Sequence, residues 1–508
     1  MRSNGPRPSP TLIRSRAGKF LLRSAILLGA LYVILLIPAP EPSPGRNTSQ
    51  QPFAWKQDAF WAELEARFVK ARATGCDTLA AGIAGAHAWV SQTLDEISRG
   101  PLAPEDSRFD GLETNLFHLA PLVAACPTHL KDFASLANRT RSEVKKQSRS
   151  WDMNSAVARQ RVYRLLFGTR MALEEIMLQS PAGSAGPELV LCDDTPSQTP
   201  STSVRGVKLH SGDILLSRGG APTSSLIARG NDYPGSFSHV ALVHVDERTG
   251  RASMIESHIE SGVAITPVDV YLADKKLRIL LLRLRPDLPA LKADPMLPHR
   301  AAAQALDEAR RRHIPYDFAM DYRDHRVQFC SEVAAAAYEA TGVRLWMGIS
   351  WISSPTVRAW LGSLGVRHFE TQEPSDLEYD PQLSVVAEWR DSTTLLAAHA
   401  DDAVTDVMLE EAQPGRPLAY NRLALPAARL AKAWSFVLNQ FGKPGPIPEG
   451  MSAATALRVK KFRNEHDARS DRLQVQAEEF RKARGYAPSY WDLTRLAREA
   501  KPNGKGPR

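Results

Sequence analysis

The chain has 508 residues, enough for about three domains, and it carries a formal net charge of +8. Hydrophobic residues make up 43% of it, a share that is ordinary for a soluble protein and sufficient for a buried core. Part of the positive charge lies within the first 23 residues, directly before an apolar segment, and no base-reading motif occurs in the chain. These features argue against a nucleic-acid-binding protein and favour a signal for membrane topology.

The apolar segment covers residues 24–37 and runs into a Pro-rich stretch. It reaches the roughly 20 residues that cross a bilayer if residues 20–22 are added and Arg23 extends its charge toward the interface. Residues 1–40 are therefore predicted to be a cytoplasmic basic flank and an uncleaved signal anchor in the inner membrane, with the rest of the chain in the periplasm of a Gram-negative cell. A cleaved signal peptide is the alternative, although no clean small-x-small cleavage site follows the segment.

Helical patterning follows this anchor. Residues 41–51 are rich in Pro, Ser and Gln and are predicted to be a linker. Beyond it, aromatic and aliphatic residues recur near helical spacing, so residues 52–180 are predicted to form an antiparallel helical domain with a structural role. Helices are expected at residues 77–97, 112–125, 130–146 and 156–178.

The chain contains four cysteines, Cys76, Cys126, Cys192 and Cys330. A disulfide is expected in an oxidising compartment, and Cys76 with Cys126 is the favoured pair because both lie in the helical region. The alternative is that all four are buried thiols. Spacing alone does not choose among the connectivities.

The pattern of hydrophobic and polar residues changes after a Pro-, Gly-, Ser- and Thr-rich linker at residues 181–203. Short β-type segments then alternate with helical ones, which predicts an α+β domain over residues 204–370. A turn at residues 247–250 is expected to join two of the strands as a hairpin. The strands are expected at residues 213–217, 238–245, 252–257 and 278–284, and the helices at residues 300–312 and from Cys330 onward.

The last third of the chain, residues 371–508, is predicted to be a mostly helical region that ends in a flexible tail. Mixed charges on these segments are typical of solvated helix faces, and no internal repeat is evident. Helices are expected at residues 385–401, 427–441, 453–464, 471–484 and 491–501.

Cys330 is the first candidate for chemistry. It lies where a strand-like or loop segment turns into an Ala-rich helix, with Gly342 at the expected end of that helix. Unsatisfied N–H groups in the first turn of a helix favour negative charge, which predicts a lowered pKa for the thiol. A thiolate is the reactive form of a cysteine nucleophile, and it needs a base.

His239 is the best candidate for that base, because it begins a strand rich in β-branched residues, where side chains are often presented to substrates. His244 lies on the same strand at the opposite parity and therefore faces away. If the next strand pairs across the predicted hairpin, Glu256 falls opposite residues 239–243, where a carboxylate could orient the imidazole. Cys330, His239 and Glu256 are thus the predicted nucleophile, base and orienting residue.

Other interpretations of these residues remain. A cysteine in an Ala-rich helix is commonly a small buried hydrophobe, and a histidine on a strand is commonly structural. His239, His244, Glu256 and His258 have the atom types of a zinc site, but strand parity separates the first two and the His-Glu-x-x-His spacing is absent. No Gly-x-Ser-x-Gly elbow of a serine hydrolase occurs. No metal or other cofactor is therefore expected.

Several motifs occur in one order along the chain, and together they resemble a known family, the YiiX-like permuted papain-fold cysteine hydrolases of the NlpC superfamily. The resemblance covers about residues 204–370, and the order His, acid, Cys is that of a circular permutation of papain. The motifs are His210-Ser211-Gly212-Asp213-Ile214-Leu215-Leu216, Ser238-His239-Val240, Ile255-Glu256, Pro315-Tyr316-Asp317 and Phe329-Cys330-Ser331-Glu332.

The resemblance implies a thiol hydrolase that cleaves amide or ester bonds, with Cys330, His239 and Glu256 as its triad. It leaves the substrate open, since the superfamily acts on cell-wall peptides and on acyl-lipid bonds. Asp213 and Asp317 match family positions, but capping and turn formation are the expected roles. We expect the substrate in the cell envelope, either peptidoglycan peptide or acyl-lipid. The alternatives are a non-catalytic envelope-binding or scaffold protein and an acyltransferase. The sequence indicates no oligomeric state.

Overall fold

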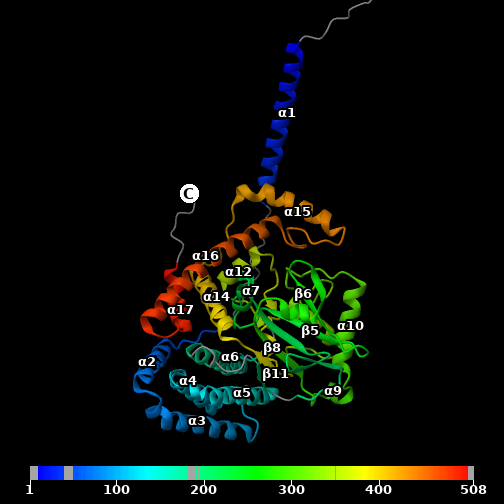
Figure 1. Ribbon diagram of the computed structural model, residues 1–508. Helices are drawn as coiled ribbons and strands as arrows, with labels where there is room; N and C mark the ends of the chain where they lie inside the picture. The colour runs from blue at the N-terminus through cyan, green and yellow to red at the C-terminus, as the bar shows by residue number, and fades with distance from the viewer. Residues whose placement is uncertain (1–9, 39–49, 181–188, 193–194, 349, 501–508) are drawn as a thin grey trace, which may run out of the picture.

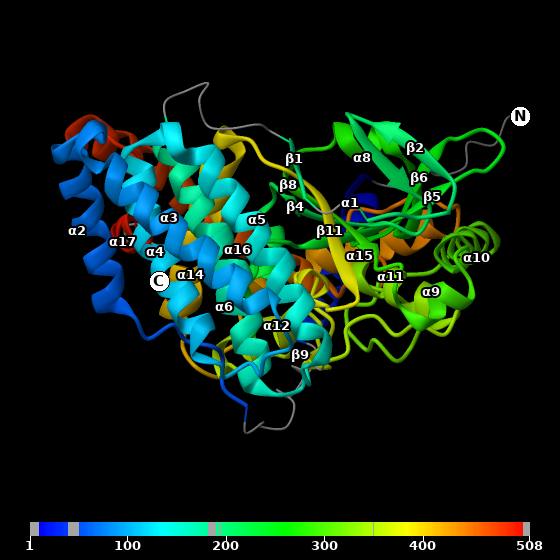
Figure 2. The ribbon, with the colours of Figure 1, turned by 90° about the horizontal axis from the view of Figure 1, so that it is seen from below.

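The computed structural model describes residues 10–38, 50–180, 189–192, 195–348 and 350–500. The fold is α+β, with a helical N-terminal region, an antiparallel sheet domain and C-terminal helices (Figure 1). Seen from below, the N-terminal helices lie beside the sheet domain, and the sheet runs between them and α10 (Figure 2).

The N-terminal region forms the predicted helices. Cys76, the first residue of α3, is bonded to Cys126, the C-cap of α4, which confirms the favoured disulfide pair. Cys192 and Cys330 are free thiols. The helices of this region are α2 (Asp58–Thr74), α3 (Cys76–Ser98), α4 (Ser107–Ala125), α5 (Leu130–Gln147) and α6 (Ala156–Gln179), with the short 3-10 turns η1 (Pro127–His129) and η2 (Ser148–Ser150).

The central sheet has seven antiparallel strands in the order β1-β11-β8-β4-β5-β6-β7. All four strands predicted from the sequence are present in it, and β5 and β6 form the predicted hairpin. The strands are β1 (Leu189–Leu191), β4 (Ile214–Gly219), β5 (His239–Val245), β6 (Ala252–His258), β7 (Gly262–Pro267), β8 (Lys276–Leu284) and β11 (Leu383–Trp389). Two small sheets pair β2 (Ser201–Val204) with β3 (Val207–His210), and β9 (Ser350–Trp351) with β10 (Glu370–Thr371).

Alternate residues along each strand enter different cores, because successive side chains of a strand point to opposite faces. Val240 and Leu242 of β5 pack with the helices α10 (Leu297–Arg311) and α11 (Cys330–Glu339). Ala241 and Val243 pack instead with β3 and Tyr271 of α8 (Val268–Ala273). Both faces of the sheet are therefore covered, which explains the apolar runs in these strands. The remaining short helices of this part are α7 (Pro222–Arg229), α9 (Pro289–Ala293), α12 (Pro355–Ser363) and α13 (Asp376–Tyr379).

The helix predicted at residues 385–401 is wrong in its first part. Residues up to Trp389 form β11, which pairs with both β8 and β1, and the helix α14 (Ser392–Glu411) begins only afterwards. A short apolar run is compatible with either structure, and here the hydrogen bonds of a sheet assembled from distant segments decide the outcome. The sheet also takes strands from outside the predicted range 204–370.

The C-terminal helices follow α14. The two helices predicted at residues 453–464 and 471–484 are one continuous helix, α16 (Ala453–Arg484), which ends at Gly485 in the left-handed conformation typical of a helix C-terminus. The others are α15 (Leu425–Asn439), preceded by the turn η3 (Arg422–Ala424), and α17 (Tyr490–Glu499). The predicted tail, residues 502–508, lies outside the described residues.

Buried ion pairs hold the N-terminal helices to the sheet. Arg170 of α6 contacts Glu388 of β11 at 3.1 Å and also Glu378 of α13, and all three side chains are fully buried. Glu174, one turn further along α6, accepts a hydrogen bond from Arg278 of β8 at 3.1 Å. Removing one partner of such a pair leaves an uncompensated buried charge, at a cost of about 3–5 kcal/mol. These pairs make the helical region part of the scaffold behind the sheet.

The apolar N-terminal segment lies in the helix α1 (Pro10–Leu36), which projects from the rest of the protein (Figure 1). By length and mean hydropathy, none of the helices among the described residues qualifies as a membrane span. The signal anchor expected in residues 1–40 thus stays a prediction, and residues 1–9 and 39–40 of that range lie outside the described part of the chain.

Candidate active site

Helix α11 presents Cys330 as its first residue. The helix begins here because Glu332 reaches back to accept a hydrogen bond from the Phe329 N–H at 2.8 Å, which satisfies an N–H group that the helix leaves unpaired. Val333, Ala334 and other apolar side chains of α11 then pack against the face of the sheet that carries Val240. The N-terminus of α11 is thereby fixed near the start of β5.

The sheet brings His239 and Glu256 together. His239 is the first residue of β5, and the β5–β6 pairing places Ala241 opposite Glu256, as the predicted hairpin requires. The His239 Nε2 atom lies 2.7 Å from the Glu256 carboxylate. Because Nε2 faces the carboxylate, Nδ1 is the ring nitrogen left to exchange a proton with another group.

The thiol of Cys330 lies against the backbone on both sides of His239. Its Sγ atom donates a hydrogen bond to the Ser238 carbonyl at 3.8 Å, and the Val240 N–H also interacts with it. The structure therefore places all three residues predicted from the sequence at one site: Cys330 from α11, His239 from β5 and Glu256 from β6.

The pKa of Cys330 differs from the sequence expectation. Burial raises the pKa of this thiol to about 12, since the residue is only 4% exposed and its charged form loses hydration. The N–H groups of Val240, Ser331 and Cys330 oppose this rise, as a helix N-terminus should, but they are the weaker effect. The predicted low pKa of the thiol is thus wrong, because the sequence does not reveal how deeply the first turn of α11 is buried.

The imidazole and the carboxylate respond to burial in different ways. Burial lowers the pKa of His239, even though the hydrogen bond that its ring donates to Glu256 raises it, and this favours the neutral ring. Burial alone would raise the pKa of Glu256, but the hydrogen bonds with His239 and His258 hold it well below its usual value. The arrangement at neutral pH is a charged Glu256, a neutral His239 and a neutral Cys330.

His258 is a member of the site that the sequence offered only as a possible metal ligand. Its Nε2 atom lies 3.2 Å from the other oxygen of Glu256, and its ring stacks on that of His239 at 5.5 Å between centroids. The hydrogen bond to Glu256 raises the pKa of His258. One carboxylate therefore holds two imidazoles. The spacing in the sequence could have indicated this contact. His258 follows Glu256 by two residues on β6, and residues two apart on a strand lie on the same face.

The distances between the possible metal ligands can also be compared here with those of a metal site. The ligand-capable atoms of His239, Glu256 and His258 all lie within 4.8 Å of one another. Both Nε2 atoms are directed at the carboxylate, so each imidazole is held by a hydrogen bond to Glu256. A metal ion bound by these three side chains would have to take the place of those hydrogen bonds. His244 faces away, as its parity predicts, and stacks on His299 of α10.

Glu373 is a neighbour of the thiol that the sequence did not indicate. The Ser331 hydroxyl donates to the carbonyl of Gln372 at 2.5 Å, which holds this segment beside the N-terminus of α11. Burial raises the pKa of Glu373 well above its usual range, and a negative charge on it would raise the pKa of Cys330. A neutral carboxyl group therefore lies near the thiol. It comes from a loop far along the chain, so no local pattern could have revealed it.

The two aspartates of the family-like motifs have structural contacts. Asp213 forms a buried ion pair with Arg283 of β8 at 2.7 Å and accepts a hydrogen bond from the His210 N–H. Asp317 accepts hydrogen bonds from the N–H groups of Ala319 and Asp321, which closes a turn. The expected capping and turn-making roles are confirmed.

Comparison with known proteins shows which family this domain resembles. Residues 208–387 match the family described as permuted papain-like amidase enzyme, YaeF/YiiX, C92 family, and this range runs from β3 to β11 and contains all the candidate residues. No curated protein matches the chain. The sheet domain of this chain is therefore similar, over residues 208–387, to the YaeF/YiiX, C92 family of permuted papain-like amidases, a family of cysteine hydrolases.

Proposed function

We propose that Cys330 is the nucleophile, His239 the general base and Glu256 the orienting residue of a hydrolase for amide or ester bonds. The observation that carries this assignment is the His239–Glu256 pair, at 2.7 Å, beside a thiol at a helix N-terminus. The sulfur forms a thioester with the substrate carbonyl carbon while the bond to the leaving nitrogen or oxygen breaks. His239 takes the thiol proton, gives it to the leaving group, and then activates the water that hydrolyses the thioester.

The backbone at the start of α11 supplies donors for the developing oxyanion. The N–H groups of Cys330 and Ser331 lie close enough to the sulfur to affect its pKa, and they are in the first turn, where a helix leaves its N–H groups unpaired. Fixed donors of this kind stabilise the negative charge of a tetrahedral intermediate.

The order of proton transfer follows from the pKa directions. Burial raises the pKa of Cys330 and lowers that of His239, so the pair rests as thiol and imidazole rather than as thiolate and imidazolium. The proton therefore leaves the thiol as the sulfur attacks.

We further propose that the substrate is cell-envelope material, peptidoglycan peptide or acyl-lipid, and that the chain acts in the periplasm from an inner-membrane anchor. Support comes from the basic residues before the apolar segment and from the exposed apolar side chains of α1. The Cys76–Cys126 disulfide also favours an oxidising compartment.

Product analysis by mass spectrometry tests this function. Incubation with purified muropeptides and with phospholipid is expected to release a new free carboxylate from one substrate class, and a chelator is expected to leave the rate unchanged. Product that forms only after a nucleophilic acceptor is added would replace the hydrolase by an acyltransferase. Substrate binding without turnover would support the non-catalytic binding protein, and loss of activity with chelator would support a metal site.

Replacing His258 with glutamine is expected to move the acidic limb of the pH–kcat/KM profile to higher pH. The charge on His258 lowers the pKa of His239, so its removal raises that pKa. Because His239 must be neutral to act as a base, activity at pH about 6 falls several-fold, while activity well above the limb changes little. The pH profile of the purified variant measures the shift.

His244→Gln is the matched control for this variant. His244 lies on β5 at the opposite parity and packs against His299, so its replacement is expected to leave the acidic limb in place. An unchanged limb in His258→Gln, or an equal shift in both variants, would show that the charge of His258 does not act on His239.

A further inference from the structure

The helix α15 exposes an apolar stripe. Its side chains recur at helical spacing from η3 through α15 to Phe441, two residues beyond the end of the helix, and Phe436 of α15 is also exposed. Large apolar side chains on an exposed helix face mark a surface that binds a membrane or another molecule. The stripe consists of Leu423, Leu430, Trp434, Val437 and Phe441, of which Leu430 is 62% exposed and Phe441 is 74% exposed.

The opposite face of α15 is fixed to the protein. Leu425 and Ala428 pack with Ile447, Met451 and Ala453 in a small core, and the Ser435 hydroxyl accepts a hydrogen bond from the Ile447 N–H at 2.9 Å. The helix therefore cannot rotate to bury its stripe without losing this core.

The helix α15, which carries the stripe, extends across the base of α1 (Figure 1). The Arg429 guanidinium donates to the carbonyls of Leu35 at 2.9 Å and Ile37 at 2.6 Å, groups that the end of a helix leaves unpaired. Tyr32 of α1 donates to the Leu423 carbonyl at 3.2 Å. Between Leu22 and Ile37, α1 and the residue after it expose apolar side chains, so the stripe continues the apolar surface of that part of the helix.

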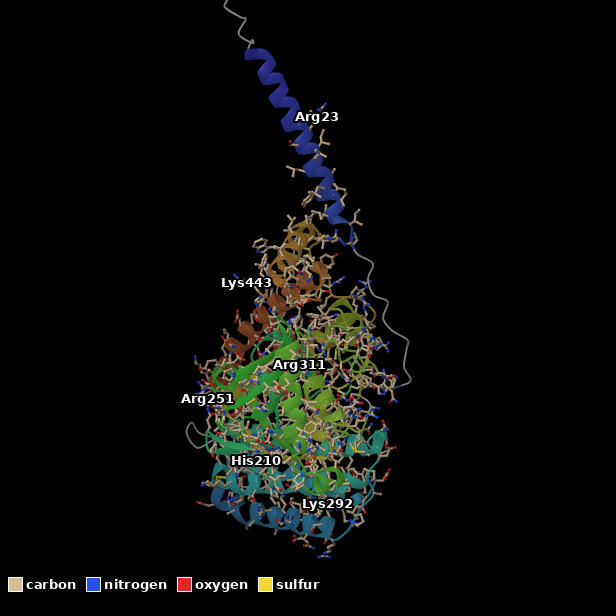
Figure 3. The ribbon with its side chains drawn as sticks, turned by 90° about the vertical axis from the view of Figure 1, so that its right-hand side faces the viewer. Arg23, His210, Arg251, Lys292, Arg311 and Lys443 are labelled. Carbon is tan, nitrogen blue, oxygen red and sulfur yellow. A yellow bond between two sulfur atoms is a disulfide. The ribbon has the colours of Figure 1, made fainter. Side chains whose placement is uncertain are left out.

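The segment that carries the stripe has charged residues of one sign. Residues 412–448 contain no acidic residue and contain the cations Arg416, Arg422, Arg429, Lys432 and Lys443. Lys443 projects at the edge of the protein that faces α1, on which Arg23 is labelled (Figure 3). Cations beside an apolar stripe with Trp and Phe are the composition of a helix that lies in the interface of an anionic bilayer.

We propose that α15 lies flat in the surface of an anionic phospholipid bilayer, with its stripe among the lipids and its cations at the headgroups. The inference extends the proposed membrane location and is independent of the reaction at Cys330. A second copy of the chain would fit this face less well, because the same cations would meet one another across the interface. The contacts of Arg429 and Tyr32 fix α15 to α1, so the bilayer also sets the orientation of the sheet domain.

The test places a fluorophore on the stripe of the full chain in vesicles of phosphatidylcholine and phosphatidylglycerol. Cys192→Ser and Cys330→Ser remove the free thiols, and Leu430→Cys carries an environment-sensitive label. Val475→Cys on α16 is the matched control, since Val475 is an exposed apolar residue, 60% exposed, on another helix. The label at position 430 is expected to shift to the blue and to be quenched several-fold more than the control by lipid-borne nitroxides, more strongly by shallow than by deep ones.

Each other result overturns the proposal in a recognisable way. A chain that floats with vesicles while the two labels are quenched equally keeps the anchor and removes α15 from the interface. A label at position 430 whose emission shifts to the blue but is not quenched by the lipid-borne nitroxides indicates that a second copy covers the stripe. If the chain does not float with the vesicles, both the membrane anchor and the binding of α15 to the bilayer are excluded. Because Cys330 is replaced throughout, none of these results depends on the hydrolase assignment.

The cations provide an independent arm of the same experiment. In a chain with Arg416→Gln, Arg422→Gln and Lys443→Gln, quenching of the label at position 430 is expected to lose its dependence on phosphatidylglycerol. Unchanged dependence on anionic lipid in this variant would rule out the proposed role of the charges.

Discussion

Replacing Cys330 with alanine is expected to reduce turnover by about 10⁴-fold or more, because no other group at the site can form the thioester. The fold should persist, since alanine is smaller than cysteine and α11 keeps its packing against the sheet through Val333 and Ala334. Product release under saturating substrate and the thermal unfolding midpoint measure the two parts of this prediction.

Cys192→Ala is the control for the loss of a free thiol. Cys192 is half-buried and contacts Arg141 and Asn138, far from the site in the fold, so this variant should retain activity. Substantial turnover by Cys330→Ala would mean that the nucleophile is another residue, and unfolding of that variant would move the test to Cys330→Ser.

Replacing His239 with alanine is expected to reduce kcat/KM by about 10²–10⁴-fold, the usual contribution of a general base. Glu256→Gln should cost less, because glutamine keeps an oxygen that can accept a hydrogen bond from His239 Nε2, although it removes the charge and places an NH2 group opposite His258 Nε2. The charge of Glu256 raises the pKa of His239, so its loss lowers that pKa and moves the acidic limb to lower pH. This shift is opposite in sign to the one expected for His258→Gln.

The opposite signs make the set of variants a test of the whole arrangement. Full activity in Glu256→Gln, with an unshifted pH profile, would remove the carboxylate from the mechanism. A larger loss in Glu256→Gln than in His239→Ala would instead indicate that the neutral amide disrupts the buried contacts with both imidazoles, and circular dichroism of the variant distinguishes this from a chemical effect.

Local patterns in the sequence were sufficient for several parts of the site. The period of two along a strand and the turn at residues 247–250 predicted that Glu256 faces the start of β5, and the register of Ala241 with Glu256 agrees. The Ala-rich run predicted that Cys330 begins a helix. These features depend on residues close together in the chain, and so do most helix positions. Cys76 and Cys126 are 50 residues apart, and their pairing was favoured because both lie in the helical region.

Other properties were decided by contacts between distant segments. Residues 385–389 form a strand because β1 and β8 pair with them, although their local pattern also suits a helix. The pKa of Cys330 is raised because α11 is packed on the sheet, and Glu373 lies near the thiol because a loop from beyond β10 returns to it.

Among the individual residues, the sequence by itself determined the identity of the candidates and the faces on which they lie. Cys330, His239 and Glu256 were identified because spacing and parity are local properties of helices and strands. The tertiary structure alone decided how far each is buried, that His258 shares the carboxylate, and that the apolar stripe of α15 faces outward. Burial and shared partners depend on which distant elements cover a residue, and a periodic pattern is the same whether its apolar face meets a core or a membrane.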